Sequence, residues 1–176
     1  MDLAGRARPA AVHAFGRVVG AHAHDVDGEV VAVDDETATL LDVLRAVGKT
    51  SVKDGCSPQG QCGCCTVLVD GQPRVSCVTP VRRVRGREIT TVDGIDAADV
   101  DRWIDAFAGT GGSQCGFCTA GIICRFEGLR SKGASHDDRD AAADSLLAHM
   151  CRCTGWQPIV DAWVAFPKAT GVVRSE

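Results

Sequence analysis

The sequence contains no long apolar run, no surplus of basic residues and no continuous apolar stretch near its start. A membrane-spanning helix needs about 20 consecutive apolar residues, so no membrane span is expected. The net charge of −4 gives no indication of a nucleic acid partner. Residues 1–20 carry Arg6, Arg8 and Arg17 but lack the apolar core of a secretory signal. We therefore expect a cytoplasmic protein in which residues 1–20 form an extension of unknown role.

Internal repeats and low-complexity segments are also absent. Of the 176 residues, 45% are hydrophobic and 24% are charged, which is the composition of a globular protein. A chain of this length forms one large domain or two small ones.

Cysteine, in contrast, is abundant, and eight of the ten cysteines form two groups of four. The first quartet is Cys56, Cys62, Cys65 and Cys77, and the second quartet is Cys115, Cys118, Cys151 and Cys153. Four thiolates around one point are the ligands of a [2Fe–2S] cluster or of a structural zinc ion. Disulfide bonds would need an oxidising compartment, and the adjacency of Cys64 and Cys65 suits a metal better than a disulfide.

Iron–sulfur ligation fits the first quartet best. The plant-type pattern is C-x4-C-x2-C followed by a distant cysteine. Cys62 and Cys65 form the C-x2-C pair, Cys77 follows after eleven residues, and Cys56 precedes Cys62 by five residues where the pattern has four. Glycines in this loop let the backbone aim N–H groups at sulfur. Cys64 is interpreted as a small buried hydrophobic residue that does not bind the metal. The alternative is that Cys64 replaces Cys65 as a ligand.

The second quartet is expected at the start of two helices. Cys115 and Cys118 precede one helix, and Cys151 and Cys153 precede another that begins near Pro158. Helix N-termini carry partial positive charge and would stabilise an anionic cluster. Cys124 lies within the first of these helices and is expected in the core.

The residues before about position 80 predict a sheet with one helix packed across it. The pattern indicates strands over Val18–Val26, Glu29–Val33, Thr66–Val69 and Arg74–Val78, and a helix over Leu40–Val47. Asp27-Gly28 and Asp70-Gly71 are two-residue hairpin turns, and Thr39 with Asp42 forms a capping box. This order is that of a β-grasp sheet.

The residues after about position 90 have a helical period and predict a small bundle of helices. The first helix has Val100, Trp103, Ile104 and Phe107 on one face, and Gly109–Gly112 ends it. The second carries Ile122, Ile123 and Phe126, the third spans Asp140–Met150 with Leu146, Leu147 and Met150 inward, and the fourth spans Pro158–Phe166. We therefore predict an α+β protein with domains at 21–88 and 89–170. Each domain is expected to be stabilised by the metal that its quartet binds.

Four stretches of the sequence resemble the small iron–sulfur subunit of the xanthine oxidase family of molybdenum hydroxylases, which includes carbon monoxide dehydrogenase and the aldehyde oxidoreductases. The stretches are Gly55-Cys56, Gln61–Gly71, Gln114–Thr119 and Cys151–Ile159. The resemblance extends roughly from Val26 to Phe166. It implies an N-terminal plant-type ferredoxin-like domain and a C-terminal four-helix-bundle domain, each with one [2Fe–2S] cluster.

The resemblance also implies partners. It implies a large subunit with a molybdopterin–molybdenum centre and a medium subunit that binds FAD. Gln114 and Cys153 are then expected to contact the pterin of the partner chain, and no residue of this chain is expected to be catalytic. Phe117, Trp156 and Ile159, which flank the second quartet, are expected at the interface with this partner. The function implied is relay of electrons from molybdenum to flavin or an external acceptor. A free-standing ferredoxin-like shuttle and a structural protein with two zinc sites are the alternatives.

Overall fold

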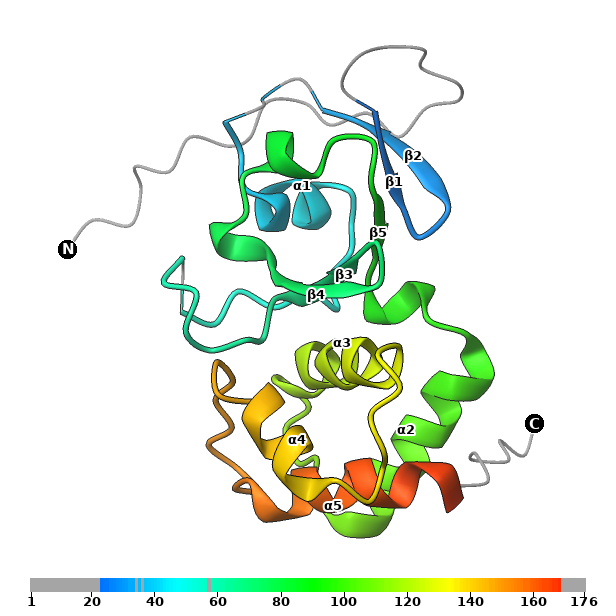
Figure 1. The fold of residues 1–176 in the computed structure, drawn as a ribbon. Helices are drawn as coiled ribbons and strands as arrows, with labels where there is room; N and C mark the ends of the chain where they lie inside the picture. The colour runs from blue at the N-terminus through cyan, green and yellow to red at the C-terminus, as the bar shows by residue number, and fades with distance from the viewer. Residues whose placement is uncertain (1–22, 34, 36, 57, 169–176) are drawn as a thin grey trace, which may run out of the picture.

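The computed structural model describes residues 23–33, 35, 37–56 and 58–168 (Figure 1). The extension at residues 1–20 and the first part of the strand expected from Val18 lie outside the described residues. The described chain has a sheet and one helix in its N-terminal part and four helices in its C-terminal part, so the α+β class is confirmed.

The sheet has five strands in the order β2-β1-β5-β3-β4. The strands are β1 (Ala23–Val26), β2 (Glu29–Ala32), β3 (Thr66–Val69), β4 (Gln72–Val75) and β5 (Glu88–Thr90). β1 runs parallel to β5, and the other neighbours are antiparallel. Both predicted hairpin turns are confirmed, because Asp27-Gly28 and Asp70-Gly71 all have positive φ, as a type I′ turn requires.

Helix α1 (Leu40–Ala46) packs across this sheet. Its predicted capping box is confirmed, since Thr39 accepts from the Asp42 amide and Asp42 accepts from the Thr39 amide. Leu40 and Leu44 are fully buried, and Val26, Val67 and Ile89 from the sheet belong to the same core.

Two strands differ from the sequence expectation. β4 ends at Val75, and the expected continuation to Val78 is a 3₁₀ turn over Ser76–Val78 that carries Cys77. β5 has no counterpart in the sequence analysis, because three residues are too few to show a period. It crosses the expected domain boundary between residues 88 and 89, so a boundary that keeps the sheet whole lies after Thr90.

The C-terminal helices are α2 (Ala97–Thr110), α3 (Thr119–Arg130), α4 (Arg139–Ser145) and α5 (Gln157–Ala165). α2 ends at Gly111 in the left-handed conformation, and Pro158 lies in the first turn of α5, both as expected. Trp103 and Trp163 are fully buried in the core that these helices share. Ile104 was expected on the buried face of α2, but it is 39% exposed.

The expected third helix is shorter than its pattern indicated. α4 ends at Ser145, and only Leu146 of the three residues expected to point inward is buried. Leu147 is 85% exposed and Met150 is 63% exposed. After the helix, His149 and Met150 contact the first cysteine loop of the N-terminal part.

α3 lies directly beneath the sheet and joins the two parts of the molecule (Figure 1). It packs on β3 and β4, and a Cβ placed on Gly128 would meet the Pro73 ring at 2.1 Å. The same helix contributes Ile122 and Phe126 to the helical core. One helix therefore belongs to both packing layers.

Asp27 connects three segments of the N-terminal part. Its carboxylate accepts from the Thr91 amide at 2.7 Å and from the Thr91 hydroxyl at 2.8 Å, and it pairs with Lys49 Nζ at 2.9 Å. The Asp27 side chain is only 5% exposed. One buried carboxylate therefore connects the β1–β2 turn, the segment after α1 and the link to α2.

We expect Asp27→Ala to destabilise the fold by about 2–3 kcal/mol, since it leaves buried Thr91 donors and a partly buried ammonium without their partner. In thermal unfolding this corresponds to a midpoint roughly 5–10 °C lower for a chain of this size. Asp25→Ala is the matched control, because the carboxylate of Asp25 accepts an exposed bond from the Gly28 amide of the same turn. Equal midpoints for the two variants would contradict the role given to Asp27.

Candidate iron–sulfur sites

The first quartet lies between the sheet and the helices. Cys56 and Cys62 belong to the loop that follows α1, Cys65 directly precedes β3, and Cys77 lies on the 3₁₀ turn that follows β4. Cys62, Cys65 and Cys77 are buried, and Cys56 is partly exposed. The hairpin β3–β4 brings Cys65 and Cys77 together although eleven residues separate them.

The longer loop after Cys56 directs backbone donors at its sulfur. Burial alone would raise the pKa of Cys56, but N–H groups of Cys62, Gln61 and Gln59 together lower it to about 6. Burial raises the pKa of Cys77 to about 12, and the neighbouring Cys65 sulfur contributes to the same shift. The extra residue in this loop is thus compatible with a backbone that stabilises a thiolate.

The second quartet lies nearer the surface of the helical part. Cys118 is buried at the start of α3, Cys151 is partly exposed, and Cys115 and Cys153 are exposed. Burial favours a higher pKa for Cys151, but bonds from Thr154 and from the Cys153 amide lower it to about 7. The Phe117 amide and the Cys153 thiol lower the pKa of Cys115.

In both quartets the sulfurs are arranged as two pairs. Cys56 contacts Cys62, and Cys65 contacts Cys77. In the second quartet Cys118 contacts Cys151, and the sulfurs of Cys115 and Cys153 are 3.4 Å apart. A [2Fe–2S] cluster has two ligands on each of its two irons, whereas zinc needs four sulfurs at about 2.3 Å from one point.

Among the described His, Cys, Asp and Glu side chains, no three converge closely enough to hold a single metal ion. Within each quartet the thiols lie near one another as two pairs, at two separate places in the described part of the chain.

The two remaining cysteines lie in the cores. Cys124 is a fully buried residue of α3, and burial raises the pKa of its thiol. Cys64 is buried between Cys62 and Cys118, and burial raises its pKa to about 12. The contact of the Cys77 amide with Cys65 Sγ at 3.5 Å supports Cys65 as the ligand in place of Cys64.

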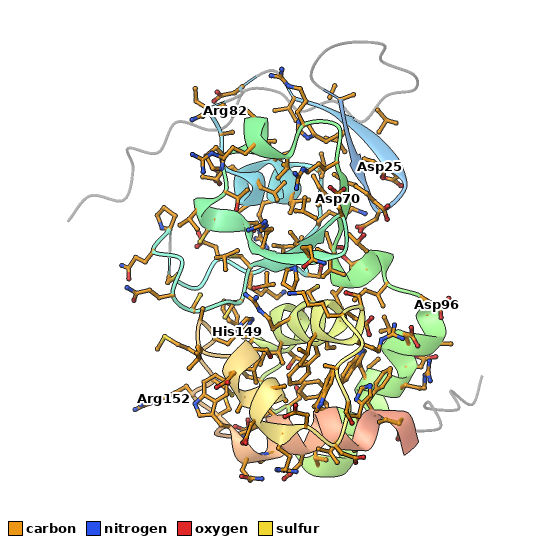
Figure 2. All side chains as sticks on the ribbon, in the orientation of Figure 1. Asp25, Asp70, Arg82, Asp96, His149 and Arg152 are labelled. Atoms are coloured by element: carbon orange, nitrogen blue, oxygen red, sulfur yellow. The ribbon has the colours of Figure 1, made fainter. Side chains whose placement is uncertain are left out.

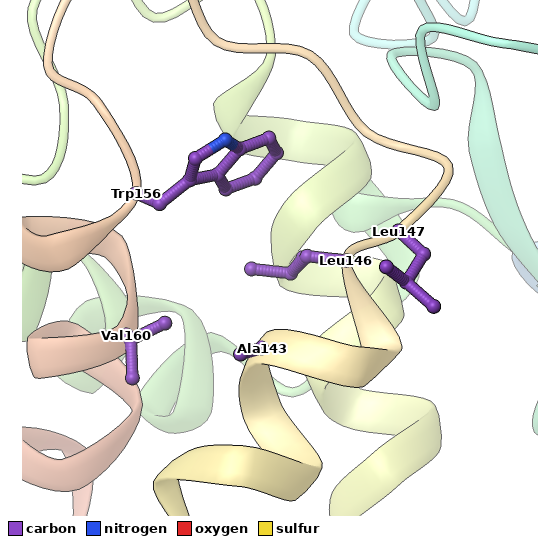
Figure 3. A pocket seen from close by; sticks show the side chains of 5 residues that line it. All are labelled: Ala143, Leu146, Leu147, Trp156 and Val160. Carbon is purple, nitrogen blue, oxygen red and sulfur yellow. The ribbon is translucent and has the colours of Figure 1, made fainter.

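Exposed aromatic side chains lie among polar ones on the surface around the second quartet. Phe117 and Trp156, expected at a partner interface, are each 43% exposed, whereas Ile159, also expected there, is fully buried. Next to them lies a cavity of about 380 Å³, lined by Ala143, Leu146, Leu147, Trp156 and Val160 (Figure 3). Gln114 is exposed beside Cys115, on the same loop.

The two sites meet along a seam, in which Cys62 and Gly63 of the first cysteine loop contact Gly121 of α3 and the backbone of Met150. A Cβ on Gly121 of α3 would lie 2.3 Å from the Gly63 carbonyl oxygen. The Met150 amide donates to the Cys62 carbonyl at 3.0 Å, and Phe117 lies against Gly55 of the first cysteine loop. Neighbours of the second quartet thus contact the loop that holds the first.

His149 lies in this seam, and the sequence analysis did not single it out (Figure 2). A lone histidine two residues before Cys151 has no spacing pattern that would mark it. Only the folded chain shows that its ring packs against Gly63.

Two family models match the chain. Residues 24–92 match the "2Fe-2S iron-sulfur cluster binding domain", and residues 91–164 match the "[2Fe-2S] binding domain". These two ranges contain the first and the second quartet respectively.

Curated relatives agree with the family models. The chain is 43% identical over 133 residues to aldehyde oxidoreductase of Megalodesulfovibrio gigas, covering 73% of this chain and 14% of the relative. It is 36% identical over 133 residues to a probable xanthine dehydrogenase subunit of Bacillus subtilis, covering 75% of each. The chain therefore spans a small part of the first relative and most of the second.

Solved structures show the same relationship. The aldehyde oxidoreductase of Desulfovibrio gigas matches with a TM-score of 0.74 and 38% identity, over 82% of this chain and 16% of that one. Quinoline 2-oxidoreductase from Pseudomonas putida matches with a TM-score of 0.72 and 33% identity, over 85% of this chain and 96% of the solved chain. The chain belongs to the [2Fe–2S] iron–sulfur subunits and domains of the xanthine oxidase family.

The seam gives a test of how tightly the sites are joined. We expect Gly121→Ala to destabilise the protein by about 1–3 kcal/mol, because its Cβ can be accommodated only if backbone moves. Gly109→Ala in α2 is the matched control, since a Cβ there meets nothing within 4 Å. The control should be neutral or slightly stabilising in thermal unfolding. A Gly121→Ala midpoint equal to that of the control would show that the seam is loosely packed.

Proposed function

We propose that this chain is the electron-transfer subunit of a molybdenum hydroxylase complex, with one [2Fe–2S] cluster in each quartet. The observation that carries the proposal is the arrangement of each quartet as two pairs of thiols. When bound, each cluster would accept and pass on one electron at a time. The chain supplies the thiolate ligands, the backbone donors around them and the fixed placement of the two sites.

The eight quartet cysteines are the proposed ligands. Cys56 with Cys62 would hold one iron of the first site and Cys65 with Cys77 the other. Cys115 with Cys153 and Cys118 with Cys151 would do the same at the second site. In this proposal the N-terminal part is a plant-type β-grasp ferredoxin-like domain, and the four C-terminal helices form the bundle of the second domain.

The proposed partners are a large subunit with the molybdopterin–molybdenum centre and a medium subunit with FAD. The exposed sulfurs of Cys115 and Cys153, surrounded by exposed Phe117 and Trp156, support docking of the large subunit at the second quartet. Buried partner interfaces are enriched in such aromatic residues. Gln114, in the loop before α3, and Cys153, in the loop before α5, would then contact the pterin from the exposed surface.

A cytoplasmic location is part of the proposal, because a reducing compartment keeps cysteine available for metal. None of the helices in the described part of the chain is long and apolar enough to cross a membrane. The free-standing electron shuttle is the alternative, and the exposed apolar surface at the second quartet favours a partnered chain over it.

Metal analysis tests the proposal directly. The full chain, purified with its co-purifying proteins, should contain roughly four iron and four acid-labile sulfide ions, two of each per quartet.

The ligand assignment is tested with serine variants. Cys77→Ser should remove one paramagnetic signal of the reduced protein, and Cys118→Ser should remove the other. Cys124→Ser is the control, since Cys124 is buried away from both quartets, and it should leave both signals. Stoichiometric zinc, or a Cys64→Ser variant that loses a signal which Cys65→Ser retains, would contradict the assignment.

Gln114 tests the pterin contact. Gln114→Ala should retain both signals, because Gln114 is no ligand, and should slow cluster reduction by substrate in rapid-mixing experiments. Gln157→Ala is the matched control, since Gln157 is also exposed but bonds to Asp161 on its own helix. If the two variants are reduced at the same rate, Gln114 is an ordinary loop residue.

A further inference from the structure

His149 occupies the narrowest part of the seam. Its side chain is 2% exposed, and a Cβ on Gly63 would lie 2.4 Å from His149 Cδ2. Gly63 directly follows Cys62, and His149 precedes Cys151 by two residues. The ring thus fills the space between a loop of the first quartet and the segment that leads into the second.

The ring nitrogen Nε2 joins the two parts of the molecule. It is 3.3 Å from Thr66 Oγ1 and 3.3 Å from the Gly121 carbonyl oxygen. Thr66 begins β3 directly after Cys65, and Gly121 lies in α3 three residues after Cys118. Because a carbonyl oxygen can only accept, the bond to Gly121 places the ring proton on Nε2.

The ring has its contacts on one side only. Among the described residues, no hydrogen-bond partner reaches the buried Nδ1 atom, so the ring is held by Nε2 and by packing.

We propose that His149 is a positioning residue that fixes the separation of the two cysteine sites and, with it, the rate at which an electron passes between them. The inference rests on the proposed function, because it requires a cluster in each quartet. The Met150 amide, bonded to the Cys62 carbonyl at 3.0 Å, anchors the backbone beside the ring. His149 acts through its contacts with Gly63, Thr66 and Gly121.

The test compares three variants of the full chain within its complex. His149→Phe keeps a flat ring of similar size but removes the Nε2 link, and His149→Asn keeps a donor on a smaller side chain. His136→Phe is the matched control, because His136 also lies in the helical part but bonds Trp163 and stacks on aromatic rings. Iron content shows first whether both clusters form.

The decisive readout is the magnetic interaction between the two reduced clusters, because the coupling of two unpaired spins falls steeply with their separation. We expect both His149 variants to retain iron, to show an altered splitting of the two signals, and to pass electrons between clusters several-fold more slowly. His136→Phe should match the unchanged protein in all three measurements.

An unchanged splitting and rate in both His149 variants would overturn the inference while leaving the proposed function intact. Loss of iron from both variants would equally overturn it, since His149 would then be needed only for the fold. Absence of iron–sulfur clusters from the unchanged protein would instead refute the proposed function, and the inference with it.

Discussion

The arrangement of this protein depends on a close contact of backbone with backbone. α3 approaches the first cysteine loop so closely that a Cβ on Gly121 would collide with the Gly63 carbonyl, and a Cβ on Gly63 would in turn collide with His149. Only glycine permits this approach. Because Cys118 is the N-cap of α3 and α3 packs beneath the sheet, this contact ties the helix that follows Cys118 to the loop of the first quartet and helps to join the two parts.

The pattern of the sequence was sufficient for most of the N-terminal part. Asp27-Gly28 and Asp70-Gly71 fix two hairpins through local backbone preference, and Thr39 with Asp42 fixes the start of α1 through local hydrogen bonds. Such features depend on neighbouring residues only, so they can be predicted without the fold. The grouping of the cysteines was predictable for a different reason, because metal ligation imposes its own spacing.

Features that depend on contacts distant in sequence could not be predicted in this way. β5 is a strand only because β1 and β3 provide partners on both sides. α4 ends before Leu147 although the apolar pattern continues, and Ile159 is buried because α5 turns that face toward the core. The role of His149 requires Gly63, Thr66 and Gly121 to meet, which no local pattern indicates.

The unequal depth of the two quartets has a chemical consequence. Three cysteines of the first quartet are buried, whereas two of the second are exposed. Thiols open to solvent are the ones that oxidants and competing chelators reach first. In the proposed complex, a partner that covers the second quartet would therefore also shield it from oxygen. Late docking of that partner would leave the second quartet open to oxidation, while the first would remain sheltered by its own fold.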